Sequence, residues 1–312
     1  NYNYSRSTKT CTETINNKQT QTLVIKNGNT TVTGTEIRLL KGSTITLTCN
    51  GNATTPSWVA GSASAILSNG QTNGSTLPPN QISVTGNSIG TCKVTVTCDE
   101  NASYSAGTAY VNIVVYEKQN QNVSIKKKSD NADASGSKIT VGDTLNLVSS
   151  SSTSTTSVKS WAITSGGSYA EITYTGNNAT ISAKGRGKVT VKVIYSSNDN
   201  YNEGSKEITL YVYANQNPKV SISNSSVVYT SGSDNTKTKE LTISVTNSNT
   251  TASYKVKSGN IKLTNNKITA TGSTGSTAYI TITCPEDTTS YYNKWEQDYA
   301  ITVRHEKTPE PD

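Results

Sequence analysis

The sequence of 312 residues contains no methionine, no phenylalanine and a single histidine, His305. Catalytic centres and metal sites are commonly built from histidines, or from cysteines and carboxylates at short spacing. This chain has no Cys-x-x-Cys pair and no group of histidines, and His305 follows the last expected strand. We therefore predict that the protein is not an enzyme and that it uses no cofactor and no metal ion.

Long hydrophobic runs are also absent. No apolar stretch approaches the roughly 20 residues that a membrane-spanning helix needs, and no signal-peptide pattern opens the chain. We expect no direct insertion into a membrane. Because the sequence begins at Asn1 and lacks methionine, we also expect that a leader has been removed or that this is part of a longer product.

Charged residues are few and scattered. The 28 basic and 21 acidic residues give a net charge of +7, and the only run is the three lysines at 126–128. A nucleic-acid-binding surface needs a basic stripe interleaved with stacking aromatics, whereas this run lies where an expected strand ends. Lysines on a solvated strand edge discourage edge-to-edge pairing, so we predict no nucleic-acid partner.

What the sequence does contain is a regular alternation of apolar and polar residues. Apolar residues make up 32% of the chain. They concentrate in runs of period two, such as Val189, Val191 and Val193, and the breaks between runs are filled by Gly, Asn and Ser. This pattern is typical of antiparallel strands with one buried face, so we expect an all-β chain.

The strand pattern occurs three times, at intervals of about 100 residues, the length of one sandwich of the immunoglobulin (Ig) type. We predict three tandem sandwiches at residues 20–117, 118–214 and 215–305, an N-terminal extension at 1–19 and a C-terminal tail at 306–312. The linkers, 117–121 and 214–218, are too short to let neighbouring sandwiches move far apart. We therefore expect an elongated, semi-rigid rod.

One large aromatic residue recurs at the same place in every copy, each time after a serine. On the third strand of a sandwich, such a ring fills the space between two sheets that lie about 10 Å apart. We predict that these aromatics are core residues rather than ligand-binding platforms: Trp58, Trp161 and Tyr254.

The second copy carries the most complete set of motifs. They are V-G-D-T-L at 141–145, Ser160-Trp161, G-R-G-K-V-T-V at 185–191 and Asn200-Tyr201. On these motifs the chain resembles the group 2 bacterial Ig-like domains of the invasin and intimin type, over residues 20–305. The resemblance implies three tandem Ig-like antiparallel β-sandwiches that act as extracellular spacers or binding surfaces at the cell surface. Similar domains also decorate tailed-phage capsids and fibres.

The chain contains five cysteines. In an Ig-like sandwich the strands that carry Cys49 and Cys98 face each other across the core, so the resemblance implies a disulfide between these two residues. Such a bond would place the protein in an oxidising compartment. The states of the remaining three stay open: Cys11, Cys92 and Cys284.

We predict a non-enzymatic, extracellular structural or adhesive protein that binds a protein or glycan on a cell surface. One alternative is a virion protein of a phage capsid or tail that aids host attachment, with other virion or envelope subunits as partners. Another is a set of accessory modules from a larger carbohydrate-active enzyme. A homo-oligomer is compatible with each of these roles.

Recognition by such a protein should use exposed loops. Exposed aromatic residues contribute much of the binding energy at interfaces. The candidate contacts are therefore loop 68–80 of the first copy and, preferred, an aromatic loop of the third copy: Tyr291, Tyr292 and Trp295.

Overall fold

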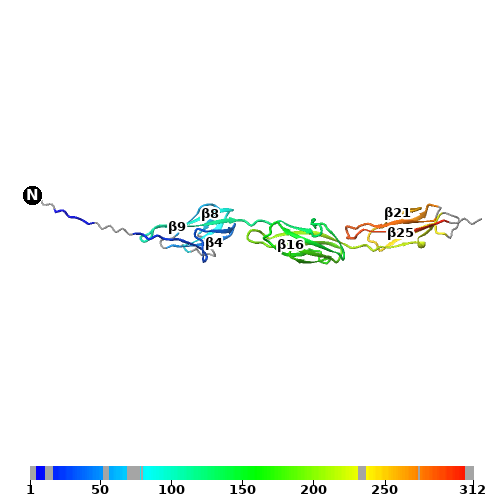
Figure 1. Ribbon diagram of the computed structural model, residues 1–312, viewed down its shortest axis with the longest axis horizontal. Helices are drawn as coiled ribbons and strands as arrows, with labels where there is room; N and C mark the ends of the chain where they lie inside the picture. Colours follow the sequence, from blue (N-terminus) through cyan, green and yellow to red (C-terminus); the bar gives the residue numbers. More distant parts are fainter. Residues whose placement is uncertain are drawn as a thin grey trace, which may run out of the picture. The chain divides into compact units, whose positions relative to one another are not determined.

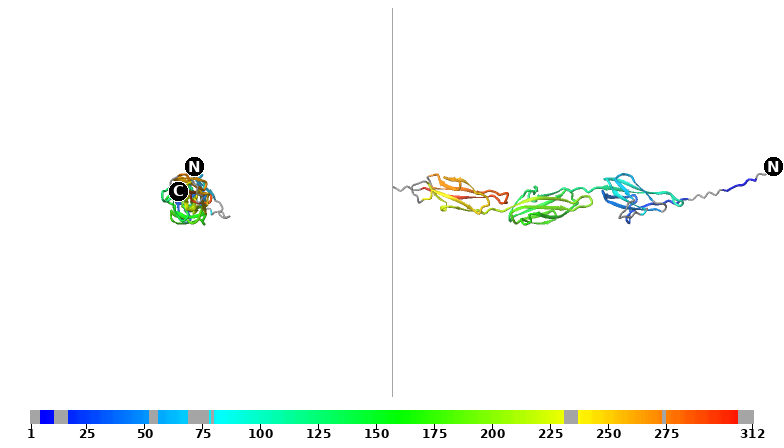
Figure 2. Two further views of the ribbon diagram at one scale, coloured as in Figure 1. Left: turned by 90° about the vertical axis from the view of Figure 1, so that its right-hand side faces the viewer. Right: turned by 180° about the vertical axis from the view of Figure 1, so that it is seen from behind.

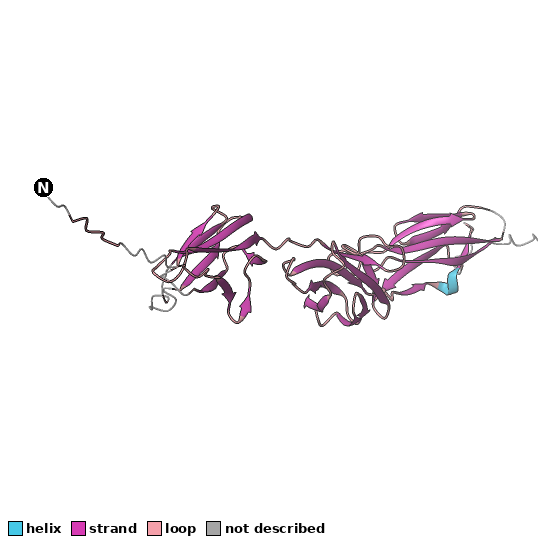
Figure 3. Cartoon of the chain, turned by 60° about the vertical axis from the view of Figure 1, so that its left-hand side comes forward, coloured by secondary structure: helices cyan, strands magenta, loops and turns pink. Residues whose placement is uncertain are grey.

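The computed structural model describes residues 5–10, 17–51, 56–68, 78, 80–230, 237–272 and 275–305. In these segments the regular structure is almost entirely β-strand, with one short 3-10 helix at Asn224–Ser226 (Figures 1 and 3). The chain divides into two compact units, Asn1–Gln119 and Asn120–Asp312. The division falls inside the expected linker at 117–121.

The first unit is a β-sandwich whose sheets have the strand orders β2-β1-β4-β7-β6 and β3-β9-β8-β5. Neighbouring strands pair antiparallel, apart from β3 and β9, which run parallel. The strands are β1 (Val24–Asn27), β2 (Thr30–Thr31), β3 (Glu36–Leu40), β4 (Thr44–Asn50), β5 (Ser57–Ala60), β6 (Ala65–Ser68), β7 (Gln81–Gly86), β8 (Gly90–Cys98) and β9 (Gly107–Tyr116).

The second unit contains two further sandwiches, which Figure 2 shows as separate bundles of strands, one green and one yellow to red. The sheets of the second sandwich are β10-β12-β15-β14 and β11-β17-β16-β13. Its strands are β10 (Val123–Lys127), β11 (Lys138–Thr140), β12 (Thr144–Ser151), β13 (Val158–Ser165), β14 (Ala170–Thr175), β15 (Asn178–Ala183), β16 (Gly187–Tyr195) and β17 (Gly204–Tyr213).

The third sandwich has the sheets β18-β20-β23-β22 and β19-β25-β24-β21. Its strands are β18 (Lys219–Ile222), β19 (Val227–Tyr229), β20 (Glu240–Thr246), β21 (Ser253–Ser258), β22 (Ile261–Thr264), β23 (Lys267–Ala270), β24 (Ser276–Cys284) and β25 (Trp295–Arg304).

All three sandwiches have the strand order of an Ig-like fold. That fold places strands A, B, E and D in one sheet and C, F and G in the other. In the first sandwich these are β1-β4-β7-β6 and β5-β8-β9. A short strand, β3, β11 or β19, adds to the second sheet beside the last strand in parallel orientation. The predicted fold class, three tandem Ig-like β-sandwiches, is confirmed.

Each sandwich buries a separate hydrophobic core between its sheets. The alternation in sequence becomes an alternation in burial: Val189, Val191 and Val193 of β16 are fully buried, while the residues between them are only half-buried. Burying one such side chain stabilises the fold by about 1.5–3 kcal/mol. A chain this polar can therefore fold, because its apolar residues are concentrated on the inward faces of the strands.

The three recurring aromatics all contribute to these cores, to different extents. Trp161 on β13 is 4% exposed, and its indole Nε1 donates a hydrogen bond to the carbonyl oxygen of Gly176 at 3.2 Å. Trp58 on β5 and Tyr254 on β21 are half-buried and pack against the cores of their own sandwiches. Burial raises the pKa of the Tyr254 hydroxyl.

Cys49 and Cys98 are free thiols, so the disulfide that the resemblance implies is not present. The two residues do lie on facing strands, β4 and β8, and their thiols are hydrogen-bonded to each other. Burial raises the pKa of Cys49 to about 11 and also raises that of Cys98, so neither readily forms the thiolate that disulfide chemistry needs. Cys92 and Cys284 are likewise free and buried, and Cys11 lies outside the described residues.

Candidate functional site

The loop at residues 285–294, which joins β24 to β25, lies against the second sandwich. Its first turn is shaped by Asp287, whose Oδ1 accepts hydrogen bonds from the backbone N–H groups of Thr289 at 2.8 Å and Ser290 at 2.9 Å. These bonds lower the pKa of the Asp287 carboxyl. Tyr291 follows with a φ of 58°, a left-handed conformation that is strained for a bulky residue. We name this segment the junction loop.

Tyr291 of the junction loop packs on two tyrosines of β17. Its ring stacks on Tyr211, with the centroids 6.0 Å apart and an interplanar angle of 22°. It also meets Tyr213 edge-on, at 5.7 Å and 87°. Aromatic pairs prefer these two geometries, and each pair contributes about 0.5–1.5 kcal/mol beyond the area it buries. The three rings therefore hold the third sandwich against the second.

The main chain of the linker takes part in the same contact. Ala214 donates its N–H to the carbonyl oxygen of Tyr291 at 3.0 Å and accepts a hydrogen bond from the N–H of Asn293 at 2.9 Å. The side-chain amide of Asn293 also donates to Thr140 Oγ1 at 3.3 Å. The junction loop is thus tied both to the linker and to β11 of the second sandwich.

Two cations of the second sandwich complete the junction. Lys138 forms an ion pair with Glu286, which raises the pKa of the lysine, and its Nζ lies 4.8 Å from the centre of the Tyr213 ring. The guanidinium of Arg186 lies over the ring of Tyr292, 4.5 Å from its centroid. Exposed contacts of these kinds contribute little to stability, because water and salt screen them. They orient the junction loop more than they stabilise it.

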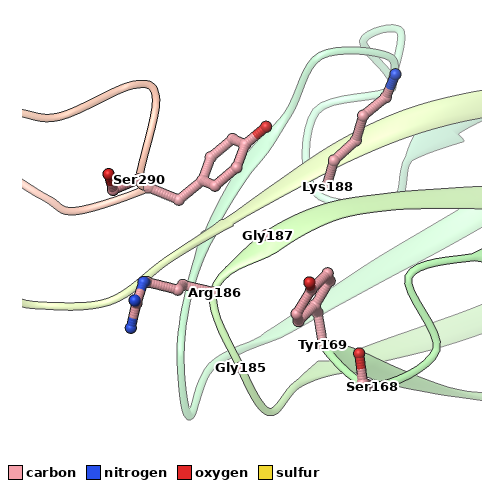
Figure 4. A pocket seen from close by; sticks show the side chains of 8 residues that line it. Ser168, Tyr169, Gly185, Arg186, Gly187, Lys188 and Ser290 are labelled. Atoms are coloured by element: carbon pink, nitrogen blue, oxygen red, sulfur yellow. The ribbon is translucent and has the colours of Figure 1, made fainter.

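A pocket with a volume of about 760 Å³ opens beside this contact (Figure 4). The ring of Tyr169 lies over Gly187, where φ is 153° and a Cβ atom would come within 2.4 Å of the ring. In Figure 4 the side chains of Arg186 and Lys188 extend in different directions from the backbone around Gly187. Residues of both sandwiches line this junction pocket: Ser168, Tyr169, Gly185, Arg186, Gly187, Lys188, Ser290 and Tyr291.

A buried glutamine precedes the first strand of every sandwich, and sequence reasoning missed it. Gln21, Gln121 and Gln216 are 6%, 7% and 5% exposed. Each donates its side-chain N–H to main-chain carbonyls around the loop before the last strand; Gln216, for example, donates to Pro285 at 2.8 Å and Asn293 at 2.9 Å. A single glutamine in a linker rich in Asn and Gln does not indicate a structural role, but its recurrence in all three copies could have done so. We call this buried glutamine, with its hydrogen bonds to the loop, the glutamine latch.

The aromatic loop predicted to contact a partner lies at the junction rather than at a free tip. Tyr291 and Tyr292 contact the second sandwich, and Trp295 packs against the third core. Their exposure was expected because the sequence does not show that a neighbouring sandwich covers them. A role for the three residues in binding a partner stays a prediction. Of the other candidate loop, 68–80, only residues 68, 78 and 80 are among those described.

One short sequence motif has the spacing of a catalytic element. The segment 86–90, G-N-S-I-G, has the letters of a nucleophile elbow, which requires a turn from a strand into a helix. Here the segment joins two strands, β7 and β8. Within the described segments, no three His, Cys, Asp or Glu residues are grouped so that they could hold a metal ion. No helix in the same segments is both long enough and apolar enough to span a bilayer.

Comparison with known proteins gives likeness in fold only. No family model matches the chain, and no curated protein matches it. Among solved structures, titin domains I67-I69 in an E-to-A mutated variant are 10% identical with a TM-score of 0.38, covering 92% of this chain and 100% of that one. Drosophila N-cadherin EC1-4 is 10% identical with a TM-score of 0.32, covering 87% and 74%.

Domains 4-9 of the surface layer protein SbsC are 12% identical to this chain, with a TM-score of 0.28. That match covers 91% of this chain and 47% of the other, so the chain spans about half the length of the surface layer structure. At such low identity and TM-score, none of these likenesses identifies a function. The class that the strand order defines is a tandem Ig-like β-sandwich protein.

Proposed function

We propose that this chain is a non-enzymatic, extracellular stalk or adhesive segment built from group 2 bacterial Ig-like domains, which holds binding surfaces at a distance from the surface that carries it. The observation that carries the proposal is the way the second and third sandwiches are joined. A linker of a few residues is anchored at Gln216 on one side, and the junction loop places Tyr291 on Tyr211 and Tyr213 on the other.

This junction suits a spacer because it resists both bending and pulling. Bending would separate the stacked rings of Tyr291 and Tyr211. Pulling on the linker would have to break the main-chain hydrogen bonds of Ala214 and the buried bonds of Gln216, which lie on opposite sides of Asn215. A long flexible tether would offer neither resistance.

The partner of such a protein would be a protein or glycan on a cell surface. Loops at the ends of the sandwiches and the outer faces of the sheets offer surfaces for this contact. On the first sandwich, Val59 and Tyr110 are 60% and 39% exposed on the sheet β3-β9-β8-β5. The second and third sandwiches carry charged residues in the corresponding row, such as Lys192 with Glu207.

Immunogold labelling of intact native cells with an antibody against the full chain tests the proposal. Label on the outer surface of cells that have not been permeabilised is the expected result. Label confined to virus particles would mean that the protein serves as a stalk on a virion rather than on a cell. Label that appears only after permeabilisation would contradict an extracellular role. A cytoplasmic marker protein, labelled in parallel, shows whether the cells stayed intact.

A further inference from the structure

We infer that the junction pocket binds an acidic saccharide, one whose sugar rings carry carboxylate or sulfate groups. The inference deepens the proposed function, on which it rests, by naming a ligand class for one site. Three features of the pocket support it: its charge, the sequence at its turn, and the shape and chemistry of its walls.

The charge of the pocket is positive and available. Arg186 and Lys188 are exposed, and no carboxylate of the described residues forms an ion pair with either of them. Neighbouring lysines differ, because Lys138 is paired with Glu286 and Lys184 with Glu171. None of the residues that line the pocket is acidic. The lining residues therefore offer an anion two cations, Lys188 and the Arg186 that also lies over Tyr292, and no competing carboxylate. Charge-assisted hydrogen bonds are about twice as strong as neutral ones.

The turn itself does not require these two cations. They flank Gly187, which the turn needs for its positive φ and for contact with Tyr169. In the first sandwich the same turn carries Ile89 and Thr91 in their place. The turn therefore forms with uncharged residues as well. In the second sandwich Arg186 also lies over the ring of Tyr292, whereas Lys188 has no ion pair or ring contact among the described residues, so its charge has no structural role that would explain it.

The walls of the pocket suit sugar rings better than a simple anion. Tyr169 is 38% exposed beside the glycine-rich floor, and Tyr291 of the third sandwich also lines the pocket. An aromatic face packs against the apolar C–H face of a pyranose, while Ser168 and Ser290 offer hydroxyls to its polar edge. A volume of about 760 Å³ lies within the range of about 300–1,000 Å³ typical of ligand sites. The pocket is also open to solvent, so a saccharide chain can continue beyond it.

A ligand in this pocket would contact both sandwiches at once. Ser290 and Tyr291 belong to the third, and the other lining residues belong to the second. Binding therefore stabilises the arrangement in which the sandwiches meet, since any ligand stabilises the state that it binds. We expect attachment to a surface glycan to stiffen this joint.

Amide NMR of the full chain, titrated with an α-1,4-linked galacturonic acid tetrasaccharide, tests the inference. The backbone N–H groups of Gly185, Gly187 and Ser290 report on the pocket directly. We expect saturable shifts of these signals with this probe or with a sulfated chondroitin tetrasaccharide, and the tighter of the two identifies the acidic group. The galacturonate probe with every carboxylate methyl-esterified should bind at least tenfold more weakly, because it has lost the charge.

Lys188→Thr should raise the Kd about tenfold, the loss expected for one charge-assisted contact. The variant should fold, because threonine occupies the same position in the first sandwich. Lys206→Thr is the matched control: it removes one exposed positive charge from β17, five residues along the strand from Tyr211, and should leave the Kd unchanged.

Several results would overturn the inference. One is that neither acidic tetrasaccharide shifts the three signals at millimolar concentration. Another is that the esterified probe binds as tightly as the charged one. Inorganic sulfate that produces the same shifts at the same concentration would mean a simple anion site. Equal weakening by Lys206→Thr and Lys188→Thr would mean that only net charge matters. Because these measurements use purified protein, they can fail while surface labelling succeeds, or the reverse.

Discussion

A single aromatic position shows how residues of one type can differ in role between repeats. Trp161 is nearly fully buried, and its indole N–H is hydrogen-bonded to Gly176. Trp58 occupies the same position in the first sandwich, but its indole Nε1 is buried and has no hydrogen-bond partner among the described residues. An unsatisfied buried N–H costs about 1–3 kcal/mol. The two tryptophans therefore contribute differently to stability.

Replacement of Trp161 by alanine should destabilise the second sandwich by about 3–5 kcal/mol, because it removes a large buried ring and leaves a cavity. The free energy of unfolding from urea denaturation, followed by circular dichroism, measures this loss. Trp58→Ala should cost less, since that side chain is only half-buried. A Trp58→Ala loss equal to or larger than that of Trp161→Ala would contradict this ranking.

The thiol of Cys49 should make stability depend on pH in the alkaline range. Burial, and then the neighbouring Cys98, raise its pKa from the ordinary value of 9.0 to about 11. The folded protein therefore keeps the proton where the unfolded chain has lost it. The resulting stabilisation is fully present below pH 9 and declines as the pH rises from 9 toward 11, by about 2 kcal/mol in all.

Denaturation in a reducing buffer at several values between pH 8 and pH 11 measures this decline. Cys49→Ala is the control, because it lowers stability at every pH but removes this titration. The stability of the variant should fall less steeply over the same range. Parallel curves for the two proteins would show that Cys49 does not titrate as we expect.

At the scale of elements, the same latch joins the start of each sandwich to its last hairpin. In the second sandwich, Gln121 donates to the carbonyl oxygens of Ser196 at 3.1 Å and Asn202 at 2.7 Å. Its Oε1 accepts from the hydroxyls of Ser151 and Thr156, both at 2.7 Å. One buried amide thus connects three segments that are far apart in the sequence. It holds the linker against the sandwich that follows.

Gln121→Ala should destabilise the second sandwich by about 2–4 kcal/mol, since four hydrogen bonds are lost and buried carbonyl groups are left without partners. Hydrogen exchange of the amides around residues 196–202 should accelerate at the same time. Gln119→Ala is the matched control, because Gln119 is an exposed residue of the same linker. Equal effects of the two substitutions would contradict the latch.

At the scale of the whole molecule, the three sandwiches are similar but the described junction is specific to two of them. Tyr291 and Tyr292 belong to the third sandwich and meet Tyr211, Tyr213 and Arg186 of the second. The lysines that flank Tyr211 in its sheet are Lys138 on one side and Lys188 on the other. The junction and the junction pocket therefore share one surface, so that changes in either should affect both.

Tyr291→Ala should loosen the junction without unfolding either sandwich, because the ring lies between the two cores rather than within one. Distances between spin labels on the second and third sandwiches, measured by electron paramagnetic resonance, should spread over a wider range in this variant than in the unmodified protein. Tyr174→Ala removes an equally large side chain that is 47% exposed on β14, away from the junction, and should leave the distances unchanged. An unchanged distribution in Tyr291→Ala would show that the tyrosine stack does not restrain the junction.

The sequence by itself determined the strands, the number of sandwiches and the composition of each core. Alternation at period two determines which side chains of a strand share its buried face, as at Val189, Val191 and Val193. Because the whole set of strands occurs three times in the sequence, three sandwiches are the simplest arrangement. The placement of Cys49 and Cys98 on facing strands came instead from the resemblance to Ig-like domains. The alternation is a local pattern within each strand. The facing cysteines follow once the strand order of a known fold says which strands lie opposite each other.

Only the tertiary structure decided how the second and third sandwiches contact each other and which state Cys49 and Cys98 adopt. Tyr211 and Tyr291 lie far apart along the chain, and no periodic pattern says that their rings meet. The junction pocket likewise exists only because a turn of one sandwich and a loop of another come together. The raised pKa values of the two thiols also follow from their burial and their mutual contact. Contacts and electrostatics of this kind arise from packing in three dimensions, which a repeat unit does not encode.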